Sequence, residues 1–383
     1  MEKHLHIISF DVPYPVNYGG ACDVFYKLVA LHQQGIRIHL HCFEYGRDEQ
    51  PVLNQYCASV QYYKRAIGHK GFSAKLPYIV SSRINESLFS NLLKDDYPIL
   101  MEGIHCSYLL HDSRFAHRRC FVRLHNVEYR YYRELFRSSS HIIRKAYYWI
   151  ESRLLRSYEQ LTASRAMFLG LNEADNEIYR RELGCNHTRE LPLFIPPWKL
   201  ECQDGMGSYC FYHGDLNVDA NEKAAFWLLD KVFSQLEIPL VLAGKNPSKK
   251  LIEKAHANNY TCLVPNPSEK EMQDMIAKAH IHVLPSYTQT GMKVKLLNAL
   301  YNGRHCVVNQ ATIYGTGLES LCHMAETAAE FTKQIRELYH QPFTKDAVLH
   351  RQELLLQRFN NEKNALELIR LIWGNEPATT GSD

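Results

Sequence analysis

The chain has 383 residues, of which 45% are hydrophobic and 22% are charged, and its net charge is +3 at pH 7. This composition is ordinary for a soluble globular protein, and the length suggests two domains, each with its own core. Such a small net charge does not indicate nucleic-acid binding. Eleven cysteines without a C-x-x-C pair or zinc-finger spacing indicate free thiols in a reducing cytoplasm rather than structural zinc.

The first half of the sequence alternates between predicted strands and helices. Residues 1–10 lack the regions of a signal peptide and contain an apolar strand at 5–10. Strands separated by helices imply a parallel sheet covered on both faces. Further strands are predicted at 36–43, 97–101, 120–124, 166–171 and 191–194, and helices at 22–33 and 172–182.

The second half repeats this scheme after a Pro- and Gly-containing linker at 198–208. Ligands of such doubly wound sheets bind outside the carboxyl ends of the strands, where Gly214, Gly244 and Gly291 lie. No apolar run approaches the length of a membrane span. Strands are predicted at 210–213, 240–243, 261–264, 280–284 and 306–308, helices at 221–233, 248–258, 269–279, 291–303 and 346–373, and a disordered tail at 374–383.

The segment at 291–303 (GMKVKLLNALYNG) is the most informative. It follows a predicted strand, so its glycine and two lysines lie in a loop and the first turn of a helix. Helix N-termini present unpaired N–H groups and a positive dipole end, which suit a phosphate. The alternative interpretation is a Rossmann-like unit with a solvated lysine face.

Four motifs in this order resemble the GT-B glycosyltransferases and, among them, the retaining enzymes of family 4. They are PYPVNYGG at 13–20, LHNVE at 124–128, YHGDL at 212–216 and TGMKVKLLNAL at 290–300. The resemblance implies two Rossmann-like, doubly wound parallel-sheet domains facing across a cleft. The N-terminal, acceptor-side domain would span 1–197 and the nucleotide-sugar domain 209–345. The helix at 346–373 would return to the N-terminal domain.

The resemblance also implies a metal-independent transfer of a hexose, with retention, from a nucleotide-diphosphate sugar to a glycan or lipid-linked glycan. Positioned N–H donors and lysines can neutralise the leaving diphosphate, no Asp-x-Asp metal motif is evident, and we expect no cofactor. His125 matches the family histidine near the donor sugar, although it is also consistent with an ordinary loop histidine. The candidate donor-binding residues are Gly19, Gly20, Gly214, Lys245, Thr290, Gly291, Lys293, Lys295 and Asn298. The candidate acceptor-binding residues are Glu102, His105, Asn126 and Glu128.

Three of these residues have simpler interpretations. Gly19 and Gly20 allow close approach of a diphosphate or acceptor to the backbone, but they also fit a plain tight turn. Glu128 is as consistent with a helix-capping carboxylate as with an acceptor contact.

The likeness departs from the family at the ribose site. Family members carry two glutamates eight positions apart, and this chain has Thr290 and Asn298 there. An amide oxygen can accept from a ribose hydroxyl, but it lacks the charge that strengthens such a bond. Asp215 also stands where a basic residue is usual, and Lys293 with Lys295 can supply the missing positive charge. A non-catalytic sugar-nucleotide-binding or scaffold protein therefore stays open as the alternative.

Residues 118–156 contain ten basic residues interleaved with aromatic ones. This pattern suits contact with an anionic membrane face that carries a lipid-linked sugar, and it also suits a solvated basic helix with inward aromatics. No nucleic-acid motif accompanies it. A dinucleotide oxidoreductase is disfavoured because neither half has the Gly-x-Gly-x-x-Gly fingerprint after a strand.

Overall fold

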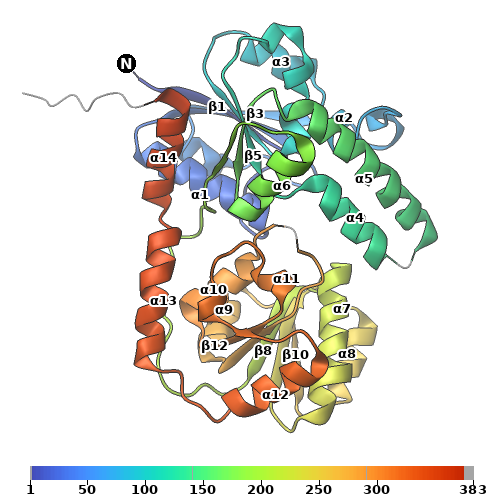
Figure 1. Cartoon of the computed structure of the whole chain (residues 1–383), viewed down its shortest axis with the longest axis vertical. Coiled ribbons are helices and arrows are strands. Elements are labelled where there is room, and N and C mark those ends of the chain that lie inside the picture. The colour runs from blue at the N-terminus through green and yellow to red at the C-terminus, as the bar shows by residue number, and fades with distance from the viewer. Residues whose placement is uncertain (1, 140, 290, 375–383) are drawn as a thin grey trace, which may run out of the picture. The chain divides into compact units, whose positions relative to one another are not determined.

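The computed structural model describes residues 2–139, 141–289 and 291–374. The chain divides into two compact units: unit 1 is built from Met1–Pro196 with Phe359–Asp383, and unit 2 from Pro197–Arg358. Each unit has one parallel sheet with helices around it (Figure 1). The predicted site residue Thr290 and residues 375–383 of the predicted tail lie outside the described residues.

Unit 1 has a seven-stranded sheet in the order β3-β2-β1-β4-β5-β6-β7, in which every neighbouring pair is parallel. The strand order reverses direction between β1 and β4, which is the topological switch point of the sheet. The strands are β1 (His4–Ser9), β2 (Arg37–Glu44), β3 (Ser59–Lys64), β4 (Ile99–Glu102), β5 (Cys120–Leu124), β6 (Met167–Gly170) and β7 (Thr188–Glu190). The helices are α1 (Gly19–Gln33), α2 (Tyr78–Ser81), α3 (Glu86–Leu92), α4 (Glu128–Ser138), α5 (Ile142–Thr162), α6 (Glu173–Leu183) and α14 (Asn361–Trp373).

Apolar side chains cover both faces of this sheet. Ile7 packs in one cluster with Leu28 of α1 and Leu368 of α14, whereas Ile8 packs in a second cluster with Val122. Successive residues of a strand point to opposite faces, so a strand buried on both sides needs a continuous apolar run. Helix α14 lies beside α1, although it is the last helix of the chain (Figure 1).

Unit 2 has a six-stranded parallel sheet in the order β10-β9-β8-β11-β12-β13. Its switch point lies between β8 and β11. The strands are β8 (Cys210–Asp215), β9 (Leu240–Lys245), β10 (Thr261–Pro265), β11 (Ile281–Leu284), β12 (His305–Val308) and β13 (His323–Met324). The helices are α7 (Asp219–Trp227), α8 (Lys249–His256), α9 (Glu269–Lys278), α10 (Val294–Asn302), α11 (Gln310–Ile313), α12 (Ala328–Leu338) and α13 (Lys345–Arg358).

The predicted pair of doubly wound parallel sheets is confirmed, but two predicted elements differ. The single helix expected at 346–373 is two helices, because Asn360 accepts a hydrogen bond from the Lys363 backbone N–H and so caps a new helix, α14. Helix α13 belongs to unit 2 and α14 to unit 1.

The strand predicted at 191–194 is wrong, because the described strand ends at Glu190. The Leu191 N–H still donates to the Gly170 carbonyl of β6 at 2.9 Å, but beyond it side chains bind much of the backbone. The Phe194 N–H donates to Asp23 Oδ1 at 2.9 Å, and Arg123 donates to the carbonyls of Leu191 and Pro192. An apolar run of this length is typical of a strand. Its hydrogen bonds to the charged side chains of Asp23 and Arg123 are evident only in the structure.

Each of the eleven cysteines is a free thiol. Within the described part of the chain, none of the helices combines the length and the apolarity needed to cross a bilayer.

Candidate functional site

The carboxyl edge of the sheet in unit 1 carries a buried group of charged side chains. Glu102 is the last residue of β4, His125 follows β5, and Asp23 and Lys27 lie one turn apart on α1. The side chains of Asp23, Lys27 and Glu102 have no exposed surface, and that of His125 is 9% exposed. The group therefore lies beside the switch point between β1 and β4, where ligands of doubly wound sheets bind.

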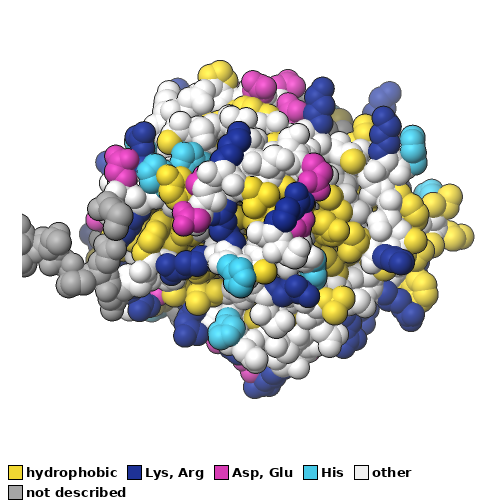
Figure 2. Space-filling view, turned by 90° about the horizontal axis from the view of Figure 1, so that it is seen from above, with side chains coloured by type: hydrophobic (Ala, Val, Ile, Leu, Met, Phe, Trp, Pro, Cys, Tyr) yellow, Lys and Arg dark blue, Asp and Glu magenta, His cyan; other side chains and the backbone are white. Residues whose placement is uncertain are grey.

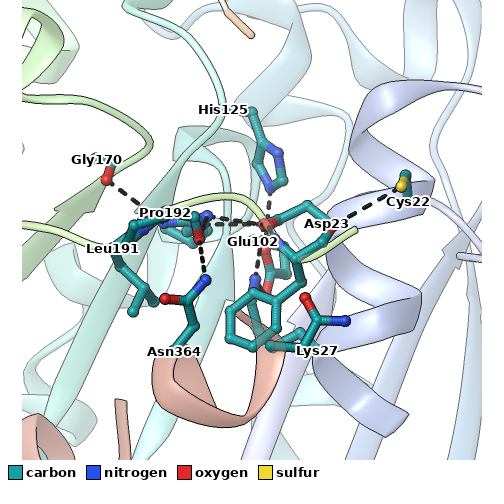
Figure 3. Close-up of polar contacts among 12 residues, drawn as sticks. Cys22, Asp23, Lys27, Glu102, His125, Gly170, Leu191, Pro192 and Asn364 are labelled. Carbon is teal, nitrogen blue, oxygen red and sulfur yellow. Dashed lines mark hydrogen bonds and ion pairs between the residues drawn. The ribbon is translucent and has the colours of Figure 1, made fainter. Parts of the chain in front are cut away.

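Figure 3 shows how these side chains converge. Lys27 Nζ lies 2.9 Å from Asp23 Oδ2 and 2.7 Å from Glu102 Oε1, so one ammonium joins two carboxylates. Arg123 binds Asp23 through two parallel hydrogen bonds of 2.9 Å. On the other side of the group, His125 Nε2 lies 3.0 Å from Glu102 Oε2. Buried charges are tolerated when they are paired and hydrogen-bonded in this way.

The charges of this network set the direction of the hydrogen bond between His125 and Glu102. Burial raises the pKa of Glu102, but Lys27 and the His125 hydrogen bond outweigh it, and the net pKa is lowered. Burial likewise raises the pKa of Asp23, and Arg123 with Lys27 hold it well below its ordinary value. Because an ionised Glu102 can only accept, His125 carries a proton on Nε2 and donates it to Glu102.

Asp23, Glu102 and His125 each place one potential ligand atom within 4.8 Å of the others. This spacing would suit a metal ion, but the ammonium of Lys27 already lies between the two carboxylates and Arg123 binds Asp23. A divalent cation would have to displace Lys27, which leaves an uncompensated buried ammonium. The residues therefore fit an ion-pair network that orients His125 better than they fit a metal centre.

Gly20 has a packing role in the first turn of α1. A Cβ at this position would lie 2.7 Å from the Phe10 ring and 2.9 Å from the Tyr18 ring, closer than real Cβ contacts. The Phe10 ring in turn packs edge-on against His125 and stacks on His105, at centroid distances of 5.3 and 5.1 Å. Gly20 thus supports the placement of two predicted site histidines, and Gly19 is the first residue of the same helix.

Two of the four predicted acceptor residues have buried carboxylates. Glu102 belongs to the ion-pair network, and Glu128, which begins α4, accepts from Asn126 Nδ2 at 3.2 Å. Burial raises the pKa of Glu128 to about 7. The fully buried Glu159 of α5 accepts from the backbone N–H groups of Glu128 and Tyr129, both at 3.0 Å. This carboxylate ties α5 to the loop that bears His125 and Asn126.

In unit 2, the corresponding edge carries six of the nine predicted donor residues, whereas Gly19 and Gly20 lie on α1 of unit 1. Gly214 pairs with Gly244 near the ends of β8 and β9, and Asp215 pairs with Lys245, whose side chain is exposed. A Cβ on Gly244 would lie 1.9 Å from the Gly214 carbonyl oxygen, so only glycine fits there. Gly291 has φ of 67°, in the left-handed region that favours glycine.

Lys295 in the first turn of α10 is the best-defined cation of this edge. Its Nζ lies 4.9 Å from the centroid of the Tyr212 ring and 3.4 Å from Asn221 Oδ1. Burial, with a smaller effect of the neighbouring Lys293, lowers the pKa of Lys295 to about 7. Lys293 precedes α10 and donates to Thr288 Oγ1 at 3.1 Å. Two lysines at one helix N-terminus form a cationic site suited to a phosphate.

Asn298 lies one turn further along α10 and is half-buried. Its side-chain oxygen accepts from Asn302 Nδ2 at 2.7 Å. The amide oxygen that would meet a ribose hydroxyl therefore already has a donor from the next turn of its own helix.

The sequence alone did not predict a site role for Asp23, Lys27, Arg123 and Asn221. A signal was present for two of them, because Asp23 and Lys27 interrupt an otherwise apolar helix at a spacing of four residues. Such a pair is more often an exposed salt bridge, and only the adjacent apolar residues indicate burial.

These two units, each with a parallel sheet and a site at the carboxyl ends of its strands, define the class of protein. Residues 207–341, which carry the predicted donor residues of unit 2, match the family model described as Glycosyl transferases group 1. Solved structures with the same arrangement are GT-B proteins, so the predicted GT-B fold is confirmed. The family match and the fold together support a role in sugar transfer.

The chain is 27% identical over 335 residues to an uncharacterized 44.6 kDa protein of the cps region of Klebsiella pneumoniae, covering 81% of this chain and 84% of that protein. It is similar in structure to Anabaena HepE in complex with UDP and glucose, with a TM-score of 0.65, 12% identity and coverage of 97% and 99% of the two chains. A trehalose-6-phosphate protein from E. coli bound with UDP-2-fluoro glucose gives a TM-score of 0.64 at 10% identity, with coverage of 98% and 100%.

Proposed function

We propose that the chain is a retaining, metal-independent glycosyltransferase of the family 4 type. It moves a hexose from a nucleotide-diphosphate sugar to a glycan or lipid-linked glycan in polysaccharide biosynthesis, in the cytoplasm and in peripheral contact with a membrane. The observation that carries this proposal is the partly buried Lys295 at the switch point of unit 2, within the segment that matches the glycosyltransferase family.

The proposed donor site uses the edge of unit 2. Lys295 and Lys293 neutralise the diphosphate as the bond between sugar and phosphate breaks, and the backbone N–H groups that open α10 add to this stabilisation. Gly214 and Gly291 keep the approach to this edge free of side chains. UDP is the donor nucleotide we favour for a first test, because two structurally similar proteins were solved with UDP ligands.

In unit 1, we assign to His125 a contact with the donor sugar, where positive charge develops at the anomeric carbon. Glu102 is a positioning residue, because it accepts the Nε2 proton of His125 and fixes the ring. The Lys27 ammonium keeps Glu102 ionised, and no metal ion is needed in this scheme. Stabilisation of a transition-state charge raises turnover more than it raises donor affinity.

A non-catalytic sugar-nucleotide-binding protein of the same fold is the second candidate. The specific observation in its favour is the amide at Asn298, whose oxygen already accepts from Asn302. Such a protein would bind a sugar nucleotide without consuming it.

One sequence of experiments separates these candidates. A thermal-shift screen against GDP-, UDP-, ADP- and dTDP-sugars finds the donor, since a ligand of the native state raises the melting temperature. The protein is then treated with EDTA and given that donor with lipid-linked and soluble glycan acceptors. Proton NMR of the product is expected to show retention. An inverted product, or activity that is lost with EDTA and restored by magnesium, would overturn the mechanism, and binding without turnover would favour the second candidate.

A further inference from the structure

Helices α4 and α5 form an antiparallel pair with an unusual surface. A hollow of about 280 Å³ lies between them. Its lining contains four arginines, three aromatic rings and a serine, and no acidic residue is among them: Tyr129, Arg133, Phe136, Arg137, Trp149, Ser152, Arg153 and Arg156. All four arginines have exposed side chains, so the positive charge faces solvent.

Three of the four guanidinium groups of this arginine hollow lie over aromatic rings. Arg153 lies over the Trp149 ring at 4.1 Å, and Arg133 and Arg156 each lie 5.8 Å from the centroid of the Tyr129 ring. Planar guanidinium groups that are stacked in this way keep their N–H donors available for the oxygens of a phosphate.

None of the four acidic residues of the two helices lines the hollow. Glu128, Glu151 and Glu159 are buried, and two of them accept hydrogen bonds from backbone N–H groups, at Tyr78 for Glu151 and at the start of α4 for Glu159. Glu134 of α4 is half-buried. The positive charge of the hollow therefore comes from four exposed arginines and a lining without a carboxylate.

An exposed apolar tip adjoins the arginine hollow. Ile142 and Ile143, the first residues of α5, are 83% and 75% exposed, and Ile150 is 50% exposed. Ile142 lies seven residues before Trp149, so the two side chains fall on the same face of the helix. Figure 2 shows hydrophobic side chains gathered at the right edge of the molecule and flanked by Lys and Arg.

We infer that the α4–α5 pair is the membrane-contacting element of this protein, with the apolar tip entering the interface and the arginine hollow binding the phosphate of an anionic lipid headgroup. Apolar side chains beside a cluster of arginines are the two signals that together hold a peripheral protein on an anionic bilayer. This inference deepens the proposed function by naming the partner of the acceptor-side unit, and it rests on that proposal only for its relation to a lipid-linked acceptor.

The test is co-flotation with vesicles of phosphatidylcholine alone or with about one third phosphatidylglycerol, without donor or acceptor. Binding only to the anionic vesicles is expected. Arg153→Gln with Arg156→Gln should weaken that binding about 25-fold, from roughly fivefold for each basic residue near an anionic surface. The matched control is Arg181→Gln with Arg189→Gln, which removes the same charge from exposed positions elsewhere in unit 1.

The apolar tip is tested separately. Ile142→Ser with Ile143→Ser should weaken anionic binding by at least tenfold, because each buried apolar side chain contributes more than 1 kcal/mol, an order-of-magnitude figure. The control is Leu161→Ser with Leu366→Ser, which removes exposed leucines outside the tip. Trp149, one of four tryptophans, lines the hollow beside the tip. The blue shift of tryptophan fluorescence on vesicle binding should therefore be lost in Trp149→Phe.

Three results would overturn the inference: unchanged binding of the arginine or isoleucine variants, an equal loss in the matched controls, or a fluorescence shift that persists in Trp149→Phe. Loss of polyuridylate binding in the arginine variants, without vesicle binding by the native protein, would assign the hollow to nucleic acid. Because donor is absent, these results do not depend on the transfer assay.

Discussion

The protonation of Lys295 makes donor binding pH-dependent. With a pKa of about 7, Lys295 is mostly charged at pH 6 and mostly neutral at pH 8.5. If a diphosphate binds only the charged form, the apparent affinity equals the intrinsic affinity multiplied by the fraction of Lys295 that is charged. That fraction falls from about 0.9 to about 0.03 over this interval, so the dissociation constant should rise about thirty-fold, which is about 2 kcal/mol.

Isothermal titration calorimetry with UDP-glucose, or with another sugar nucleotide if the screen selects one, measures this dependence. A sugar nucleotide has no phosphate that titrates in this interval, so the proton taken up belongs to the protein. Titrations in HEPES and in Tris should give different apparent enthalpies at pH 8, because each buffer supplies that proton at a different enthalpy. The dependence of the dissociation constant on pH should disappear in Lys295→Met. At pH 6 this variant should lose roughly 1.5–3 kcal/mol of binding free energy, because the charged hydrogen bond is missing.

The stability of the free protein provides an independent check on the direction of the Lys295 pKa shift. A lysine with a lowered pKa binds fewer protons in the folded state than in the unfolded state between about pH 7 and its ordinary value of 10.5. Stability should therefore rise with pH across that window, while donor affinity falls, and Lys295→Met should remove both trends. Affinity that does not vary with pH, or that varies equally in Lys295→Met, would refute the assignment of Lys295 to the diphosphate.

Four further changes test the rest of the site. Lys27→Met should lower the free energy of unfolding by about 3–5 kcal/mol in urea titrations, since it leaves two buried carboxylates without their ammonium. The control Arg181→Met, in an exposed ion pair, should change the free energy of unfolding by at most about 1 kcal/mol. His125→Ala should lower kcat at least about tenfold with little change in donor KM, and Glu102→Gln should have a smaller effect in the same direction. Asn298→Glu should retain or improve donor affinity by calorimetry; a large loss with an intact circular dichroism spectrum would place the ribose elsewhere.

The sequence predicted the regular parts of the fold well, because their signals are local. The strand at Cys120–Leu124 was predicted with its observed bounds, and glycines marked the carboxyl ends of β8 and β9. The edge strand β3 was not predicted, because its half-exposed residues include Gln61 and Lys64 and lack a clear apolar alternation.

The site was less predictable where it depends on contacts between distant segments. Lys295 could be identified from a glycine and lysines at the start of a helix. The partners of His125 could not, because Lys27 meets Glu102 across 75 residues of sequence and nothing local distinguishes this pair from surface charges. The lowered pKa of Lys295 also depends on burial, which no motif encodes.

The order in which unit 1 is assembled during synthesis follows from α14. Ile195 and Asn361 exchange two hydrogen bonds of 3.0 and 2.7 Å, so the chain leaves unit 1 and re-enters it at one place, and unit 2 is an insertion between them. At about 5–20 residues per second, α14 is synthesised roughly 10 to 35 seconds after Pro196. Until then, the apolar face that Leu28 shares with Leu368 has no cover. A nascent unit 1 is therefore expected to need a chaperone on the ribosome, and a chain truncated before α14 to aggregate even though every other helix and strand of unit 1 is present.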